Sequence, residues 1–315
     1  MINNLVFSMN TALPIFLVML AGFGLKKGRV IDDSFVKTAN VFVFYVALPI
    51  KLFYDVSQTN FLEAFDGQLL SFLIVATLVG IAISWLVGMA TTKNAAQLGA
   101  FIHGCYRGNF IYIGFSLMEN ITGSLHPKVP IVAAVMVPLY NILGVMILSY
   151  TATAPNAVDR IRKTVWSIFR NPMVLSIGAG ILASLVSLPI PLFLARTMGY
   201  FSALTTPLAL IAIGASFVLG NSMKSLRPSL TASMLKLIIL PLIAVMAAIH
   251  WGFKGDDLIL VYVFFGVPTA TTSYIMTVAL KGDSEMAANI IMITTALSVF
   301  TMTLFVFAFK TMGII

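Results

Sequence analysis

Charged residues are scarce in this sequence. Only 10% of the 315 residues are Asp, Glu, Lys or Arg, and 59% are hydrophobic, whereas soluble domains carry about 25% charged residues. A soluble chain of this length would need a charged exterior, and the apolar runs here are too many and too long for one buried core. Composition therefore disfavours a soluble enzyme and indicates an integral membrane protein in contact with a lipid bilayer.

Cysteine and centrally placed acids are also lacking. Cys105 is the only cysteine, which excludes an internal disulfide and a multi-cysteine metal site, and we expect it to be a small buried residue. No Asp or Glu falls in the middle third of any predicted membrane segment. Because carboxylates are the usual proton relays and sodium ligands of carriers, coupling to a cation through a central carboxylate is disfavoured. Neither a metal nor a cofactor is expected.

The basic residues are dispersed between the apolar runs. The net charge is +8, but there is no basic stripe or aromatic platform, so nucleic acid is not an expected partner. Lys26 and Lys27 follow the first apolar run, and Arg160, Arg162 and Lys163 follow the fifth. The positive-inside rule therefore predicts that both termini lie outside, in a multi-pass protein of a bacterial plasma (inner) membrane.

Apolar runs near 20 residues long predict ten membrane helices. They cover residues 5–25, 36–54, 68–89, 96–118, 129–150, 172–188, 192–218, 230–253, 258–280 and 287–309. The longest gap divides the chain into a first five-helix repeat (1–150), a cytoplasmic linker (151–171) and a second five-helix repeat (172–315). The basic stretch from Asp159 to Arg170 is expected to lie on the inner leaflet as an amphipathic helix.

The two halves resemble each other in their glycines and prolines. A shift of 158 positions superposes Pro14 on Pro172, Gly22 on Gly180, Pro49 on Pro207 and Gly108 on Gly266. Because each half has an odd number of helices, the second half must enter the membrane in the opposite sense to the first. The predicted fold is thus all-α, with two inverted repeats of the kind that transporters use.

Two predicted helices at matching positions concentrate helix breakers and polar groups at mid-depth. The fourth carries Gly104, Gly108 and Gly114 among His103, Arg107, Asn109 and Tyr112, and the ninth carries Gly266, Pro268, Thr269, Thr271, Thr272 and Ser273. Interrupted helices survive in a membrane only where protein buries them or where they line a wet cavity. The N-terminus of each opened half-helix attracts an anion. The alternative is that these small residues only allow close helix packing.

Arg107, Lys51, Lys236 and His103 fall inside predicted helices, where a charged or titratable side chain needs an explanation. Arg107, beside the proposed break, either binds an anion or extends to an interface. Lys51 lies near the outer end of its helix and is expected to extend to the membrane surface, whereas Lys236 lies deep enough to need a buried partner. His103 is either a proton acceptor or a hydrogen-bonded structural residue.

These residues resemble the auxin efflux carrier family, in a bacterial form similar to malonate or malate permeases. The similar stretches run from Gly266 through Ser273 and Tyr274 to Gly282 and Asp283, with Thr294, Thr295 and Ser298; from Arg107 to Asn109 with Gly114; and from Pro207 to Leu210 with Gly214, Ala215 and Ser216. The resemblance covers nearly the whole chain. One departure is Ser116, where many members have a proline.

The resemblance implies a scaffold of helices 1, 2, 6 and 7, often a homodimer interface, and a transport unit of helices 3–5 and 8–10. Substrate would bind where helices 4 and 9 cross, and alternating access would follow an elevator mechanism. The expected substrate-binding residues are Arg107, Gly108, Asn109, Tyr112, Pro268, Thr269, Thr271, Thr272 and Ser273, and the expected helix-break residues are Gly108, Gly114, Gly266 and Pro268. No catalytic residue is expected.

The sequence thus predicts a secondary transporter for a small organic anion: a mono- or dicarboxylate such as malonate or malate, or an auxin-like acid. One alternative is a sodium-coupled organic-anion symporter with a fold like that of bile-acid symporters. The alternative from another class is an intramembrane enzyme, with His103, Cys105 and Arg107 as candidate residues, or a sensor. The sequence contains no soluble output domain for a sensor.

Overall fold

The computed structural model describes residues 2–151, 162, 166, 170–216 and 225–315, and within them every regular element is a helix. In chain order the helices are α1 (Ile2–Lys27), α2 (Asp33–Phe42), α3 (Leu48–Ser57), α4 (Phe61–Ala64), α5 (Gly67–Thr91), α6 (Ala95–Tyr106), α7 (Phe115–Thr122), α8 (Lys128–Thr151), α10 (Pro172–Leu185), α11 (Leu192–Ala215), α12 (Leu226–Met234), α13 (Leu240–His250), α14 (Gly255–Gly266), α15 (Thr272–Ala279) and α16 (Ser284–Thr311). Three π-helical turns lie between helices: η1 (Val43–Ala47), η2 (Phe110–Gly114) and η3 (Leu235–Ile239). The expected amphipathic helix of the linker falls mostly on residues outside the described part.

Seven continuous helices in the described residues are long and apolar enough to cross a membrane. They are α1, the continuous α2–η1–α3, α5, α8, α11, the continuous α12–η3–α13, and α16. Helix α10 is apolar but shorter, and the predicted fourth and ninth segments are interrupted, as α6–η2–α7 and α14–α15. The chain is therefore a multi-pass, all-helical membrane protein in its described part.

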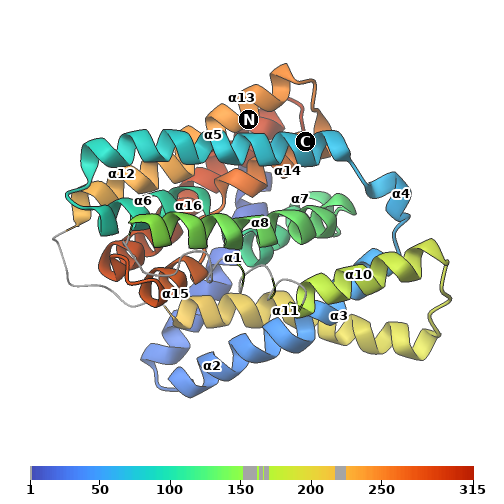
Figure 1. The fold of residues 1–315 in the computed structure, drawn as a ribbon. Helices are drawn as coiled ribbons and strands as arrows, with labels where there is room; N and C mark the ends of the chain where they lie inside the picture. The colour runs from blue at the N-terminus through green and yellow to red at the C-terminus, as the bar shows by residue number, and fades with distance from the viewer. Residues whose placement is uncertain (1, 152–161, 163–165, 167–169, 217–224) are drawn as a thin grey trace.

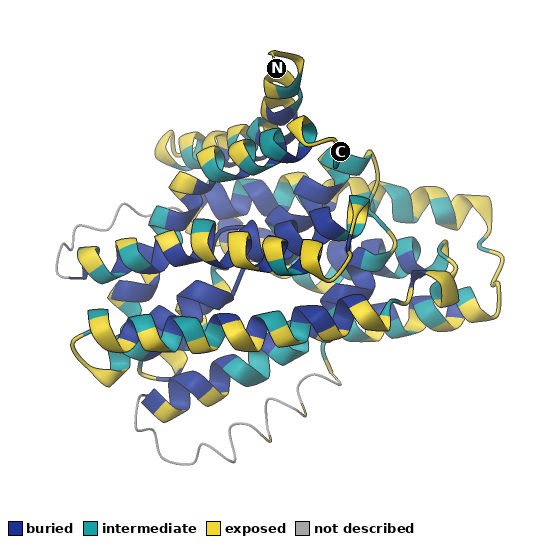
Figure 2. Ribbon diagram, turned by 90° about the horizontal axis from the view of Figure 1, so that it is seen from above, coloured by how far each residue is buried: buried dark blue, intermediate teal, exposed yellow. Residues whose placement is uncertain are grey.

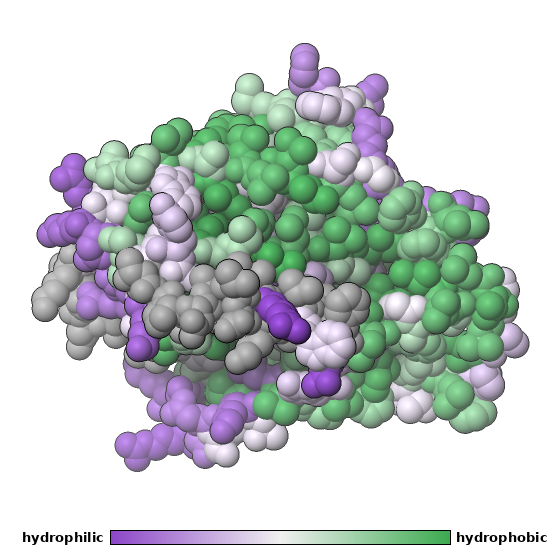
Figure 3. Space-filling model, viewed as in Figure 1, coloured by the Kyte–Doolittle hydropathy of each residue, from purple (hydrophilic) through white to green (hydrophobic). Residues whose placement is uncertain are grey.

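The outer surface has the character of a protein that is solvated by lipid. Figure 3 shows a broad hydrophobic face with hydrophilic residues gathered toward its margins. Large apolar side chains such as Leu86, Phe193 and Phe300 are exposed on helices long enough to span a bilayer. Apolar surface of this extent is unfavourable in water, whereas acyl chains contact it without a penalty.

Short polar side chains determine where several helices begin. The carboxylate or amide oxygen accepts a hydrogen bond from a backbone amide two or three residues further along, as at Asp32, Asp66, Asn94, Asn171 and Asp283. Each bond satisfies one of the amides that the first helical turn leaves without a partner. These caps lie close to the helix starts that the apolar runs predict.

Two of the π-helical turns end shortly before a proline. η1 ends two residues before Pro49, and η3 ends two residues before Pro241. Proline donates no backbone hydrogen bond, and its ring clashes with the carbonyl four residues back. A widened turn accommodates both effects without ending the helix. The η3 turn includes Lys236.

The helices form two groups, which Figure 1 shows from the side. Helices α2, α3, α10 and α11 lie together at the bottom and right of that view, and α5, α6, α12, α13, α14 and α16 lie above them. Helix α1 packs against α11 in the first group and against α16 in the second. The chain ends lie side by side, because the Asn4 side chain donates to the Thr311 hydroxyl across 3.4 Å.

Glycines allow close contacts within the first group. A Cβ at Gly22 would lie 2.3 Å from the carbonyl oxygen of Ile211 on α11, and a Cβ at Gly180 would lie 2.9 Å from the Val56 Cβ on α3. Two helix pairs, α1 with α11 and α10 with α3, therefore need a residue without a side chain at their contact. These are two of the positions that the 158-residue shift superposes.

Figure 2 shows that buried residues gather toward the middle of the molecule. Every residue from Leu258 to Gly266 of α14 is buried, as is every residue from Gly99 to Tyr106 of α6. Both half-helices therefore become fully enclosed as they approach the breaks. Their broken ends lie inside protein, as the cost of unpaired backbone groups in lipid requires.

Candidate functional site

The first helix break lies at residues 107–109. Helix α6 ends at Tyr106, and Arg107 is extended, with φ −80° and ψ 90°. Asn109 is also outside the helical region, with φ −82° and ψ 58°, and the π-helical turn η2 begins at Phe110. The Ser116 hydroxyl bonds to the carbonyl of Tyr112 within the following helix, so the interruption comes earlier in the chain than Ser116 and needs no proline there.

The second break lies at residues 267–271. Helix α14 ends at Gly266, Val267 is extended with φ −67° and ψ 151°, and α15 begins at Thr272. Pro268 explains both features, because it disfavours a helical conformation for the residue before it. Since proline has no N–H group, it also leaves the carbonyl of Phe264, four residues back, without its helical donor.

The two breaks cross and bond to each other. The Asn109 amide donates to the Pro268 carbonyl across 2.8 Å, and the Ala270 amide donates to the Arg107 carbonyl across 3.0 Å. These bonds form an antiparallel bridge between Gly108 and Thr269. The opened backbones thus supply some of each other's hydrogen-bond partners, which membrane burial demands.

Gly108 permits this close approach. A Cβ at position 108 would lie 2.9 Å from Cγ2 of Val267, 3.0 Å from Nζ of Lys236 and 3.2 Å from the carbonyl oxygen of Phe264. Those distances are shorter than ordinary van der Waals contacts, and two of the three neighbours, Val267 and Phe264, lie in the second break or in the helix that leads into it. Glycine is therefore required here for packing, beyond any conformational freedom it provides.

A cavity of about 260 Å³ opens at the crossing. Both breaks line it, together with α8 and the start of α10. The lining residues are Phe44, Arg107, Gly108, Asn109, Phe110, Ile111, Tyr112, Val137, Tyr140, Asn141, Asn171, Met173, Phe264, Ala270, Thr271, Thr272, Ile275 and Met276. The wall combines apolar surface with a few converging polar groups, which is typical of small-molecule sites.

Arg107 is the charged residue of this cavity. Its side chain is buried, with 6% exposure. Nη2 donates to Oδ1 of Asn141 across 2.7 Å, and Nε donates to the Thr272 hydroxyl across 3.1 Å. Nη1 is buried without a hydrogen-bond partner in the described residues. The guanidinium is thus held by two neutral groups, and both N–H groups of Nη1 remain unused.

No acidic side chain neutralises Arg107 in the described part of the chain. The ion pairs found there involve Lys26, Lys51, His126 and Lys128, and none involves Arg107. A buried charge without a partner is strongly unfavourable. The cavity therefore favours an occupant that brings a negative charge.

Neutral donors adjoin the guanidinium. Asn109 is 5% exposed, and its side-chain amide makes no hydrogen bond to any described residue while it lines the cavity. Helix α15 starts at Thr272 in the cavity wall; the next two amides, of Ser273 and Tyr274, donate to the carbonyls of Ala270 and Thr271, which leaves the Thr272 amide as the donor at this helix start. Arg107, Asn109 and this helix start can together donate hydrogen bonds to one carboxylate.

The structure divides the predicted site residues into two sets. Those that line the cavity are Arg107, Gly108, Asn109, Tyr112, Thr271 and Thr272, and those that do not are Gly114, Gly266, Pro268, Thr269 and Ser273. Thr269 instead bonds through its hydroxyl to the Gly104 carbonyl at 2.7 Å. The Ser273 hydroxyl lies 3.0 Å from Nδ1 of His103. In the second set, Thr269 and Ser273 thus join the two interrupted segments outside the cavity.

Sequence reasoning missed Asn141. It holds Arg107 from α8, a helix that the sequence pattern did not connect with the site. The available signal was an asparagine in the middle of an apolar run. Lys51 was expected to extend to the membrane surface, but it is buried and pairs with Asp55 and Glu119, because α7 brings a carboxylate that the sequence places 68 positions away.

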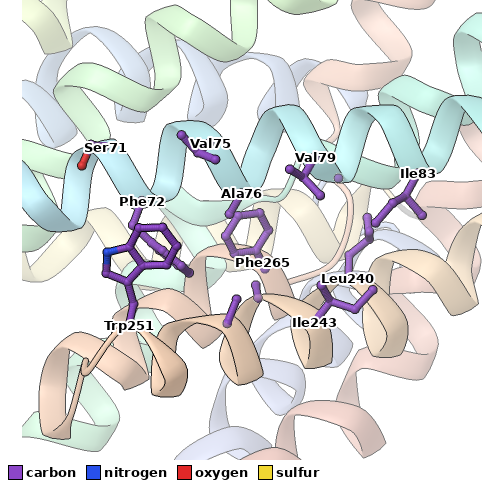
Figure 4. A pocket seen from close by; sticks show the side chains of 13 residues that line it. Ser71, Phe72, Val75, Ala76, Val79, Ile83, Leu240, Ile243, Trp251 and Phe265 are labelled. Atoms are coloured by element: carbon purple, nitrogen blue, oxygen red, sulfur yellow. The ribbon is translucent and has the colours of Figure 1, made fainter.

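A second cavity, similar in volume, has different chemistry. A groove of about 250 Å³ lies between α5 and α13, where Figure 4 shows apolar side chains with Ser71 at one end. Trp251 and Phe265 also line this groove, and no charged residue does. It can take an acyl chain but offers nothing to orient a polar solute, so charge rather than volume identifies the cavity at the crossing as the candidate site.

The family comparison connects this site with a biological role. The family described as "Membrane transport protein" matches residues 7–306. The chain belongs to this family. The match confirms the resemblance to auxin efflux carriers. It also makes the chain a membrane transporter, so the alternative of an intramembrane enzyme built on His103, Cys105 and Arg107 is wrong.

Two relatives are also named as transporters. This chain is 22% identical over 314 residues to an "Uncharacterized transporter" of Methanocaldococcus jannaschii, with 94% of this chain and 97% of the relative covered. It is 26% identical over 274 residues to the "Putative malonate transporter" of Rhizobium meliloti, with 84% of each chain covered.

Proposed function

We propose that this transporter is a secondary carrier for a small organic anion, a mono- or dicarboxylate, which binds at the crossing of the two breaks. The observation that carries the proposal is Arg107, a buried guanidinium whose Nη1 has no partner, in a cavity where the described residues supply no acid. A bound carboxylate would both neutralise the charge of Arg107 and accept a hydrogen bond from its Nη1. Asn109 and the start of α15 supply further donors.

The size of the cavity supports a small substrate. Sites for drug-sized ligands measure about 300 to 1,000 Å³, and this cavity measures about 260 Å³. A small acid such as malonate or malate fits a cavity of this size. The name of the Rhizobium meliloti relative points to the same class of solute.

The architecture that we propose is ten membrane helices in two inverted repeats, 1–150 and 172–315. Repeat symmetry requires that a contact between helices 1 and 7 recur between helices 6 and 2. In the structure, α1 packs against α11 and α10 packs against α3, each through a glycine of the superposed pair Gly22 and Gly180. The breaks at Gly108 and after Gly266 support the same relation.

An elevator-type movement is the mechanism that we propose for alternating access. The scaffold would comprise α1, α2, α3, α10 and α11, and the rest would move with the crossing. A cavity of about 500 Å³ between these groups, lined by Asn40, Ser216 and Thr295, meets the first cavity at Thr271 and Ile275. Such space between two bodies would permit sliding. A homodimer, a bacterial inner membrane and outside termini remain part of the proposal.

The decisive test is ligand binding to the purified protein, because a ligand that binds only the folded state raises the melting temperature. Wild type, Arg107→Gln and Asn109→Ala would be compared with malonate, malate, citrate, lactate, indole-acetate and neutral amino acids. Arg196→Gln is the matched control, since Arg196 is an exposed arginine on α11.

We expect one or more small carboxylates to stabilise wild type and Arg196→Gln but not Arg107→Gln, with a weaker effect for Asn109→Ala. A charge-assisted hydrogen bond contributes about 1.5–3 kcal/mol, so the loss in affinity should be about tenfold or more. Equal stabilisation of Arg107→Gln would rule out this site. Stabilisation by neutral or cationic solutes alone would rule out an anion carrier.

A further inference from the structure

Lys236 is the other positive charge at the crossing. It lies ten residues after the start of the candidate span Leu226–His250 and fourteen before its end, so it is near mid-depth. Its exposure is 1%. In the described part of the chain no carboxylate pairs with it, and a lysine in that position needs a strong reason to remain.

The ammonium group lies at the carboxyl end of the half-helix α14. Nζ of Lys236 donates to the carbonyl oxygen of Phe265 across 2.7 Å. In an uninterrupted helix that carbonyl would accept from the amide of Thr269, but this amide donates instead to the Thr294 hydroxyl across 3.2 Å. The break thus leaves the Phe265 carbonyl without its helical donor, and Lys236 donates to it instead.

The same ammonium group also lies against the other break. A Cβ at Gly108 would come within 3.0 Å of Nζ, and within 3.2 Å of the Phe264 carbonyl oxygen. Pro268 deprives that second carbonyl of its helical donor. One cation therefore adjoins both opened backbones where carbonyl groups collect, and where the helix dipole places about half a negative charge.

Carriers with broken helices place a coupling cation in such surroundings. Half-helix carboxyl ends and unwound carbonyls coordinate the sodium ion or proton at mid-membrane. We propose that the Lys236 ammonium is a built-in replacement for that ion, which positions the crossing for the anion and makes transport independent of sodium. This inference rests on the proposed function, and it treats Lys236 as a positioning residue, since it does not line the cavity beside Arg107.

The position of Lys236 in a π-helical turn explains how its side chain can take the place of a bound ion. The π-helical turn η3 carries Lys236, and a widened turn changes the direction of the side chains it contains. An ammonium group has three donors and one full charge. It can therefore bond to the second break while it lies against the first, and, being part of the chain, it does not dissociate.

The first experiment needs no variant. Uptake of malonate into proteoliposomes that contain the wild-type protein would be measured in sodium, potassium and choline chloride. Equal rates are expected in the three salts. Uptake that stops without sodium would overturn the proposal, because a separate cation would then be required.

The second experiment removes the charge. Lys236→Met keeps the apolar length of the side chain, Lys236→Gln keeps a hydrogen-bond donor, and Lys93→Met is the control at an exposed lysine. We expect the affinity for malonate to fall about tenfold in both Lys236 variants and to stay unchanged in the control. Wild-type affinity in Lys236→Met would overturn the proposal.

A rescue experiment separates a cation from packing. In Lys236→Ala, ammonium or sodium chloride should raise the melting temperature and the affinity for malonate above the values in equal choline chloride, and wild type should show no such difference. No rescue in Lys236→Ala would mean that Lys236 only fills space. Because the melting temperature of the ligand-free protein is read as well, this test still decides the role of Lys236 if no carboxylate binds and the proposed function fails.

Discussion

The two helix breaks occupy matching positions but differ in how they are opened and closed. The break after α6 has no proline, and there the Thr269 hydroxyl donates a hydrogen bond to the Gly104 carbonyl. The break after α14 is made by Pro268, and an ammonium group donates to its Phe265 carbonyl. A repeated fold thus carries two chemistries, with the guanidinium of the first break in the cavity and the ammonium group behind the second.

The largest effect is expected from filling the point where the breaks touch. Gly108→Val would place side-chain atoms against Val267, Lys236 and the Phe264 carbonyl. Overpacking of this kind costs about 1–3 kcal/mol, so the yield of folded protein and the melting temperature should fall and malonate binding should be lost.

Gly178 is the matched control, since a Cβ there meets nothing within 4 Å. Gly178→Ala should keep the melting temperature and binding of wild type. If Gly108→Val were as stable and active as wild type, the two breaks would not need their close approach, and the crossing would lose its structural basis.

Asn141→Asp would give the first break the acid that it lacks. The new carboxylate would lie where Asn141 now accepts from Arg107 at 2.7 Å, and it would neutralise the guanidinium that we assign to the substrate. Malonate affinity should fall about tenfold or more, while Asn141→Ala should have a smaller effect. Isothermal titration of both variants measures the difference, and unchanged affinity in Asn141→Asp would show that the Arg107 charge does not attract the ligand.

A smaller effect is expected at the second break, from Pro268→Ala. The restored N–H group can donate to the Phe264 carbonyl and let α14 continue by a residue, so the Pro268 carbonyl would leave the Asn109 amide, now 2.8 Å away. We expect uptake to fall several-fold with folded yield retained. Pro14→Ala in α1, away from the crossing, should transport as wild type. Equal uptake in both variants would mean that glycine alone can open the crossing.

The sequence predicted the parts of this fold that depend on local chemistry. Apolar length predicted the helical segments, and Pro268 with Gly108 predicted where two of them break. Partners distant in sequence could not be predicted in this way. Asn141 reaches Arg107 across 34 positions, and the carbonyl of Phe265 reaches Lys236 across 29, because only the packed helices bring them together.

The smallest effect concerns charges at the helix ends, away from both breaks. Partial burial opposes ionisation of Asp66, but the hydrogen bond from Lys128, at 2.8 Å, and backbone amides outweigh it and hold the pKa of this carboxyl below its usual value. A lowered pKa in the folded state stabilises the protein above the unfolded pKa of about 3.9, and this contribution is lost as the pH falls through the folded pKa.

Lys128→Met removes this ion pair and the one that Lys128 makes with Asp257 at 2.6 Å. It should therefore lower the melting temperature at pH near 7, and the part of the difference that depends on Asp66 should disappear in acid, once Asp66 is protonated in both proteins. The pair is partly exposed, so the effect should stay within about 1 kcal/mol. Malonate affinity at neutral pH should not change, because this pair lies at the starts of α5 and α8, outside the cavity. If Lys128→Met lost affinity for malonate, the charges at the helix ends would be coupled to the crossing. Charges that stabilise the fold could then no longer be separated from the charge that binds the ligand.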